Sequence, residues 1–251
     1  MRDFMSRGMN MKSYAVAVAM GLLLAVGYSS KGEAVPLCSG LDLDASGTTT
    51  YHDLILSNAG GGCQIDDKIF SGFQYTPTSI PTGSEVPDTS VVFSTITGGP
   101  GNTDGFTFTF ILNANTAVTA NDIQMSYLVT CVIGNCIDSA EVLIAGSVAN
   151  SGTATVGETY CFNGCPNPGG TLTAFLPGQP TDQASFAAVH SIGFVKDTNV
   201  ACTGAPEGCL ASISALVNTV DQPAPEPATL ALLASGLVGL GWFRRRRVNR
   251  A

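Results

Sequence analysis

Several stretches of this chain alternate apolar and polar residues with a period of two, and this pattern restricts the fold more than any other feature. GFTFTF (105–110) alternates phenylalanine with glycine and threonine. DIQMSYLVTCV (122–132) does the same with larger side chains. Its alternate positions are Ile123, Met125, Tyr127, Val129 and Cys131. A β-strand points successive side chains to opposite faces, so both stretches predict strands with one buried face.

Further strand-like runs are separated by clusters of turn residues. The runs are SVVFSTIT (90–97), AEVLIAGSV (140–148) and ASFAAVHSIGFV (184–195). The turn clusters include TGGPGNTDG (97–105) and PNPGG (166–170). Short strands that alternate with turn signals at this spacing predict an all-β fold, an antiparallel β-sandwich of about 9–10 strands.

The first 34 residues have the composition of a secretory signal peptide. Lys12 precedes an apolar run over 14–27, and small residues lead up to Ala34. The apolar run is too short to favour spanning a bilayer, and cleavage after Ala34 is expected. The alternative is a buried N-terminal helix. We therefore predict three parts: a signal peptide at 1–34, a disulfide-containing sandwich at 35–220, and a processing segment at 221–251.

The middle of the chain is strongly acidic. Between residues 35 and 227 the only basic residues are Lys68 and Lys196, against 17 acidic residues, which gives a net charge of −15. Such a surface repels phosphate backbones, so nucleic acid is excluded as an expected partner. Divalent cations and neutral or basic polymers remain compatible with it.

All eight cysteines lie in this acidic segment. They are Cys38, Cys63, Cys131, Cys136, Cys161, Cys165, Cys202 and Cys209. An even number behind a signal peptide predicts disulfides formed in an oxidising compartment. Pairing in sequence order is the simplest of the possible connectivities. Zinc is the alternative, because two of the pairs are closely spaced, but no histidine lies near either pair.

The two histidines do not form an evident catalytic group. His190 alternates with apolar residues of the run 184–195, which predicts a hydrogen-bonded core residue. His52 is the second residue of YHDLILS (51–57), which predicts a strand, so His52 and Asp53 should point to opposite faces. The sequence contains no nucleophile elbow, zinc-protease, P-loop or dinucleotide motif. A non-enzymatic protein is therefore expected. A hydrolase that uses acids such as Asp66, Asp67 or Asp197 is an alternative.

One acidic segment has the spacing of a calcium loop. In DLDASGTTTYHD, Asp42, Asp44 and Ser46 occupy positions one, three and five, Gly47 is sixth and Asp53 is twelfth. Oxygen ligands at these positions of an EF-hand-like loop wrap a calcium ion, and the glycine allows the sharp turn. The alternative is a polar turn ahead of a strand. Apart from calcium, no cofactor is expected.

The tail combines three features. A Pro-Glu-Pro triplet precedes an apolar stretch, Thr229–Phe243, and a cluster of arginines follows. The stretch is expected to form a short transmembrane helix, with an aromatic residue at the interface and the positive charges on the cytoplasmic side. The residues concerned are Pro225, Glu226, Pro227, Ala228, Thr229, Trp242, Phe243, Arg244, Arg245, Arg246 and Arg247.

This arrangement resembles the PEP-CTERM sorting signal of Gram-negative bacteria. The resemblance covers about residues 223–251 and departs from the common form only in Ala224, where valine is usual. It implies that an exosortase in the membrane recognises the signal and cleaves near the triplet. It also implies export across the inner membrane, transient anchoring through the C-terminal helix, and release to the cell surface or an exopolysaccharide matrix.

Together these features predict a secreted or cell-surface protein with a structural or adhesive role in the extracellular polysaccharide matrix. Exosortase is the expected processing partner and exopolysaccharide a candidate binding partner. A calcium- or carbohydrate-binding module is the alternative function.

Overall fold

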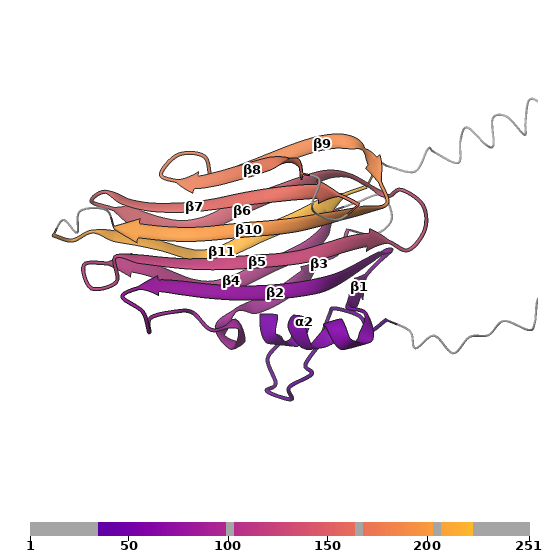
Figure 1. Ribbon diagram of the computed structural model, residues 1–251, viewed down its shortest axis with the longest axis horizontal. Coiled ribbons are helices and arrows are strands. Elements are labelled where there is room, and N and C mark those ends of the chain that lie inside the picture. Colours follow the sequence, from indigo (N-terminus) through magenta and orange to yellow (C-terminus); the bar gives the residue numbers. More distant parts are fainter. Residues whose placement is uncertain (1–34, 99–102, 164–167, 203–206, 223–251) are drawn as a thin grey trace, which may run out of the picture. The chain divides into compact units, whose positions relative to one another are not determined.

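The structure is a computed structural model that describes residues 35–98, 103–163, 168–202 and 207–222, all within the compact unit Val35–Ala251. Two antiparallel sheets form a β-sandwich (Figure 1). The six-stranded sheet runs β1 (Cys63–Ile65), β2 (Lys68–Ile80), β5 (Ala120–Cys131), β10 (Ser191–Cys202), β7 (Gly152–Phe162) and β8 (Pro168–Leu176). The five-stranded sheet runs β3 (Val92–Ile96), β4 (Asp104–Asn115), β11 (Leu210–Asp221), β6 (Ile137–Ala149) and β9 (Thr181–Val189). The predicted all-β antiparallel sandwich is confirmed.

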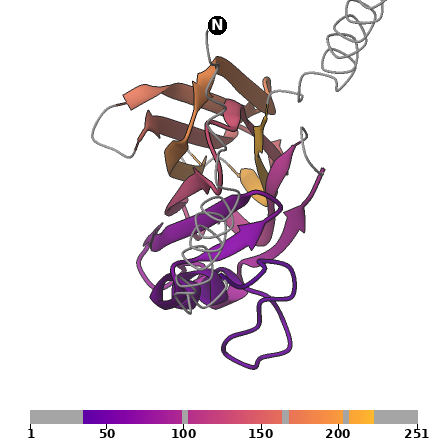
Figure 2. The same ribbon diagram turned by 90° about the vertical axis from the view of Figure 1, so that its right-hand side faces the viewer.

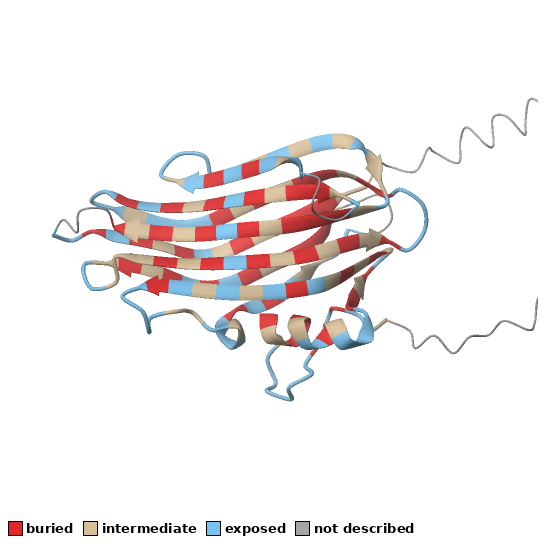
Figure 3. Ribbon diagram, in the orientation of Figure 1, coloured by how far each residue is buried: buried red, intermediate tan, exposed pale blue. Residues whose placement is uncertain are grey.

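Burial alternates along the strands as the sequence pattern requires (Figure 3). Phe106, Phe108 and Phe110 of β4 face the core, and so do the alternate residues predicted for β5. Aromatic rings join the sheets: the centroids of Phe70 on β2 and Phe106 on β4 lie 4.8 Å apart. Edge-to-face contacts of this kind add to the stabilisation from burial of apolar area.

The segment YHDLILS is a helix, and the prediction of a strand was wrong. Helix α2 (Tyr51–Ser57) lies beside β2 (Figure 2). Asp53 Oδ2 accepts hydrogen bonds from the amide of Thr50 at 2.8 Å and from its hydroxyl at 3.1 Å. This is the geometry of a capping box, which satisfies amides that would otherwise be unpaired at a helix start. Tyr51 also fixes the helix, because its hydroxyl donates to the Gln74 and Ser126 carbonyls.

A β-bulge in β2 is held by the residue that follows this helix. The pairing of β2 with β5 shifts between Ser71 and Gln74, and Gly72 adopts a positive φ of 68°. The bulge leaves the backbone of Phe73 without ladder partners. Asn58 replaces them: its side chain donates to the Phe73 carbonyl at 2.9 Å and accepts from the Phe73 amide at 3.0 Å. The extra residue turns Phe73 into the core.

The run 184–195 contains a chain reversal instead of one strand. It holds the end of β9 and the start of β10, which lie in different sheets. This division contributes to a total of eleven strands among the described residues, slightly more than predicted. His190 lies between them and is exposed, with Nδ1 2.6 Å from the Gly134 carbonyl oxygen. The prediction of a core histidine was therefore wrong.

Each described disulfide has one cysteine at the end of a strand. The bonded pairs are Cys38–Cys63, Cys131–Cys136 and Cys202–Cys209. Cys161 is also disulfide-bonded, and Cys165 lies outside the described residues. Pairing in sequence order is confirmed for the three described pairs, so zinc does not occupy these cysteines.

Candidate functional site

The outer surface of the six-stranded sheet is lined by three rows of predominantly polar side chains. Each row crosses β2, β5, β10, β7 and β8, because residues directly opposite on antiparallel strands point to the same face. The rows are Gln74, Ser126, Val195, Thr159 and Thr171; Thr76, Gln124, Asp197, Gly157 and Thr173; and Thr78, Asp122, Asn199, Thr155 and Phe175. All of these residues are at least partly exposed. We refer to them as the polar face.

The polar face offers hydroxyl and amide groups at the spacing of neighbouring strands, about 4.8 Å. Its charged members are two acids, Asp122 and Asp197, and its aromatic member is Phe175. Hydroxyl and amide groups both donate and accept hydrogen bonds, so the surface suits an uncharged ligand that carries many hydroxyl groups. This face was not predicted from the sequence. The signal was present in the polar positions that alternate with the core positions of five strands.

The two acids of the polar face interact with each other. Burial, together with a hydrogen bond and charge repulsion from Asp197, raises the pKa of Asp122 from 3.8 to about 6. Asn199 opposes this shift by donating to Asp122 Oδ2 at 3.4 Å. Two adjacent carboxylates ionise together only at a cost, so the pair retains a proton in mildly acidic solution.

We expect Asp122→Asn to raise the free energy of unfolding by about 1 kcal/mol at pH 7, a value discounted for the partial exposure of the side chain. A raised pKa in the folded state means that stability is greatest below the unfolded pKa and is lost as pH rises from about 4 to 6. The free energy of unfolding should therefore fall less between pH 4 and pH 7 in Asp122→Asn than in the wild type. Urea denaturation at both pH values measures this difference.

Glu207→Gln, which changes an exposed acid elsewhere, serves as the control and should shift stability by less than about 0.5 kcal/mol. An Asp122→Asn variant with the same pH profile as the wild type would contradict the interaction between the two acids.

The predicted calcium loop brings its carboxylates together. One oxygen from each of Asp42, Asp44 and Asp53 lies within 4.8 Å of the others. The Ser46 hydroxyl instead donates to the Thr48 carbonyl at 3.0 Å. The loop leads into helix α2 and not into a strand. The alternative, a polar turn ahead of a strand, is therefore wrong about the element that follows the turn. Gly47, at the sixth position, has a positive φ of 79°.

Backbone amides fill much of this carboxylate cluster. Asp42 accepts from the amides of Ser46 and Gly47, each at 3.0 Å, and Asp44 accepts from Ser46 at 2.9 Å. Hydrogen bonds from Ser46, through its side chain and its backbone, lower the pKa of Asp44. Asp53 is buried, and each of its two carboxylate oxygens accepts two hydrogen bonds. Asp42 and Asp44 are the exposed members that a cation could reach.

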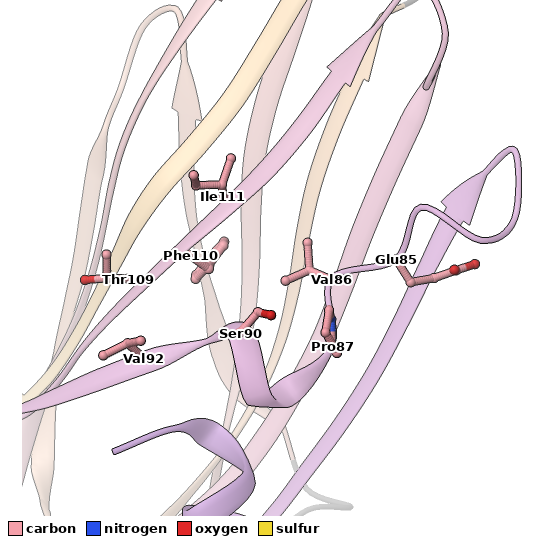
Figure 4. A pocket seen from close by; sticks show the side chains of 8 residues that line it. All are labelled: Glu85, Val86, Pro87, Ser90, Val92, Thr109, Phe110 and Ile111. Carbon is pink, nitrogen blue, oxygen red and sulfur yellow. The ribbon is translucent and has the colours of Figure 1, made fainter. Parts of the chain in front are cut away.

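An open cavity of about 490 Å³ lies at the β3–β4 edge of the other sheet (Figure 4). Its lining is mostly apolar, with Val86, Phe110 and Ile111 among the side chains. Glu85 is its titratable member, and hydrogen bonds led by that of the Gly83 amide lower the pKa of Glu85. A single acid held in its ionised form does not provide the acid–base pair that hydrolysis needs.

The acids suggested for a hydrolase do not converge. Asp66 and Asp67 form the β1–β2 turn, and Asp67 contacts Lys68, which is opposite Cys131 at the end of β5. Asp197 is opposite Gln124, near the other end of that strand.

The remaining predictions concern residues outside the described ranges. These are the signal peptide at 1–34, the Pro225–Thr229 motif, the helix Thr229–Phe243 and the arginines Arg244–Arg247. Among the described residues, no helix has both the length and the hydropathy needed to cross a bilayer.

Comparison with known proteins gives one match to a sorting motif and weak structural likenesses. A search of curated proteins found no match. TmCBM61, in complex with β-1,4-galactotriose, aligns with a TM-score of 0.29 and 9% identity over 57% of this chain and 86% of that one. The enzymatically active domain of bacteriophage CBA120 tailspike protein 4 aligns with a TM-score of 0.26 and 12% identity. The alignment covers 58% of this chain and 19% of that one. The glycosylation associate protein (Gap123) complex of Streptococcus agalactiae aligns with a TM-score of 0.27 and 3% identity. The alignment covers 59% of this chain and 26% of that one.

The family match falls on the tail. The model of the PEP-CTERM protein-sorting motif matches residues 223–247, the segment that carries the Pro-Glu-Pro triplet and the arginine cluster. This motif implies export and targeting to the cell surface through an exosortase. The chain therefore carries a PEP-CTERM protein-sorting motif at residues 223–247, and this motif implies sorting to the cell surface through an exosortase.

Proposed function

We propose that the sandwich is a non-enzymatic structural or adhesive component of the extracellular polysaccharide matrix, and that the polar face is its contact surface. The chain is held transiently in the membrane by its tail until exosortase cleaves near Pro225–Pro227. The observation that carries the proposal is the continuity of the polar face, whose three rows cross five paired strands.

Charge and chemistry both favour a neutral polysaccharide as the ligand. The two lysines of the sandwich are buried, so the acids of its surface repel polyanions. The hydroxyl and amide groups of the polar face match the hydrogen-bonding groups of sugars. Disulfide bonding of the described cysteines suits an oxidising location outside the cell.

A substitution at the centre of the polar face tests the proposal. Gly157 lies in the middle row, and a Cβ built there meets no atom within 4 Å, so a side chain fits at this position. Gly157→Glu adds bulk and a second carboxylate beside Asp197, which is directly opposite. We expect the secreted variant to lose roughly tenfold or more in affinity for the neutral exopolysaccharide of the producing cells. Sedimentation with the purified polymer measures the affinity.

Thr109→Glu, on the exposed surface of β4 in the other sheet, is the matched control and should bind as the wild type does. Equal binding by Gly157→Glu would contradict the polar face as the contact surface. Release of reducing sugars from the polymer would contradict a non-enzymatic role.

Calcium binding is a second candidate function, favoured by the convergence of Asp42, Asp44 and Asp53. Calcium needs six or more oxygen ligands, which these carboxylates, nearby carbonyls and water could supply together. Calcium at about 100 times its dissociation constant should stabilise the fold by about 2.7 kcal/mol. Asp44→Asn should remove the shift, whereas Asp138→Asn on β6 should not. Thermal denaturation with calcium or magnesium tests this, and equal effects of both ions on both variants would contradict it.

A further inference from the structure

A lysine, a glutamate and an asparagine meet in the interior of the sandwich. Lys196 on β10 and Glu158 on β7 are opposite each other in the six-stranded sheet, and Asn218 comes from β11 of the facing sheet. All three are at most 1% exposed. Each lies at a strand position whose neighbours two residues away are mostly core residues, so the charged pair interrupts an otherwise apolar face.

One oxygen of Glu158 contacts both other groups. Its Oε2 accepts from Lys196 Nζ at 2.6 Å and from Asn218 Nδ2 at 2.8 Å, and its Oε1 also accepts from Asn218 Nδ2 at 3.1 Å. The lysine amine and the asparagine carboxamide are therefore only two hydrogen bonds apart. The carboxylate lies between them and can exchange a proton with either nitrogen.

The carboxamide of Asn218 is held in one orientation. Its Nδ2 also donates to the Glu141 carbonyl at 2.9 Å, and its Oδ1 accepts from the Tyr127 hydroxyl. With two acceptors at the nitrogen and a donor at the oxygen, the network leaves no equivalent flipped arrangement. The Tyr127 hydroxyl is also placed where negative charge would develop if a nucleophile attacked Cγ.

The surroundings favour the uncharged forms of the amine and the acid. Lys196 Nζ lies 4.6 Å from the ring centroids of both Tyr127 and Phe194. Burial lowers the pKa of Lys196 and raises the pKa of Glu158. Both directions shift the proton from the lysine to the glutamate, which yields a neutral amine beside a carboxylic acid. A neutral amine is a nucleophile, whereas an ammonium ion is not.

We propose that Lys196 and Asn218 condense to an intramolecular amide bond, with Glu158 as the proton carrier and Tyr127 as the donor to the carboxamide oxygen. Lys196 Nζ forms a bond to Asn218 Cγ, and the bond from Cγ to Nδ2 breaks. Glu158 delivers a proton to the leaving nitrogen and regains one from the attacking nitrogen. Ammonia leaves, and no oxidant, reductant or other reactant is needed. The structure holds the groups in the arrangement before reaction.

The bond would link the two sheets through the core. β10 and β11 belong to different sheets and are already joined near their loop by Cys202–Cys209. Unlike that disulfide, an amide survives reducing conditions. A covalent link of this kind resists unfolding under force and proteolysis, whichever ligand the polar face binds.

The test is the mass and connectivity of the secreted protein after reduction and alkylation. We expect the intact mass to be lower than that of the unlinked chain with the same termini by one ammonia, about 17 Da. Cleavage at Glu207, which lies between the two residues in the sequence, should leave the segments that contain Lys196 and Asn218 joined. Tandem mass spectrometry then places the link.

An unchanged mass would overturn the proposal. So would a loss of ammonia with separate segments, because cyclisation of Asn218 onto its own backbone produces the same loss.

Variants assign the roles of the groups. Asn218→Ala removes the carboxamide but keeps the Lys196–Glu158 pair, so it should fold without the link. Glu158→Gln keeps the shape of the side chain and should also lack the link. The control is Lys68→Arg, since Lys68 Nζ lies 3.0 Å from Gln222 Oε1 and a reaction there would release ammonia as well. Lys68→Arg should keep the link, and loss of the mass difference in this variant alone would overturn the assignment to Lys196.

Discussion

Phe106→Ala should lower the free energy of unfolding by about 3–5 kcal/mol, because it removes the ring at the centre of the core. Phe106 is fully buried, and its ring lies between residues of both sheets. Its neighbours, with centroid distances of 4.8–6.2 Å, are Phe70, Phe73, Phe93, Phe108 and Tyr127. The loss combines the transfer free energy of the ring with the cost of a cavity that rigid strands cannot close.

Denaturation in guanidinium, with the disulfides intact, measures the effect. Phe175→Ala is the matched control, since this phenylalanine is 39% exposed on the edge strand β8 and its loss should cost less than about 1 kcal/mol. Similar losses from the two variants would mean that the rings around Phe106 collapse into the space, and that the core is less rigid than the ring contacts indicate.

The alternation of apolar and polar residues predicted the strands of this core, because it depends only on consecutive residues of one strand. A strand fixes which side chains share a face, so Phe106 and Phe108 could be assigned to the interior from the sequence. The disulfides were predictable for a simpler reason, since each described pair joins consecutive cysteines of the sequence. The sorting motif is a linear signal and was recognised without any structure.

The incorrect predictions involve interactions that are distant in sequence. Helix α2 has a capping residue at Thr50, but its stability also depends on hydrogen bonds from Tyr51 to the distant carbonyls of Gln74 and Ser126. No glycine or proline marks the reversal at His190, so the run around it resembled one continuous strand. Local propensity could not distinguish these cases.

The polar face and the internal network were missed because both require the order of the strands. The sequence shows that Thr155 and Asn199 alternate with core residues, but only the pairing of β7 with β10 makes them neighbours. Lys196 and Glu158 did give a signal, since each is a charged residue at a position where the strand pattern requires an apolar one. The facing position of Asn218 could not be deduced from alternation.

The other buried lysine provides the second large effect, and we expect Lys68→Met to cost about 3–5 kcal/mol at pH 7. Lys68 Nζ donates to Asp104 Oδ2 at 2.7 Å, and both side chains are at most 1% exposed. Lys68 begins β2 and Asp104 begins β4, so the pair connects the two sheets at one end of the sandwich. Removing the lysine leaves a buried carboxylate without its counter-charge.

The pH dependence identifies the unpaired charge as the cause. Burial already raises the pKa of Asp104 above its usual value, and Lys68 opposes this shift. Without Lys68 the pKa of Asp104 should rise further, so the folded variant binds a proton that the unfolded chain releases. Its stability is then retained below the unfolded pKa, about 4, and is lost as pH rises. Lys68→Met should therefore cost less at pH 4 than at pH 7.

Two further variants separate charge from packing. Lys68→Met combined with Asp104→Leu removes both charges and should recover most of the stability, because a buried ion pair can often be replaced by apolar residues at little cost. Asp88→Asn breaks the more exposed pair with His52 and should cost less than about 1 kcal/mol. If Lys68→Met were equally destabilised at pH 4 and pH 7, and the double variant did not recover, the loss would come from packing of the lysine side chain. The ion pair would then contribute little to joining the sheets.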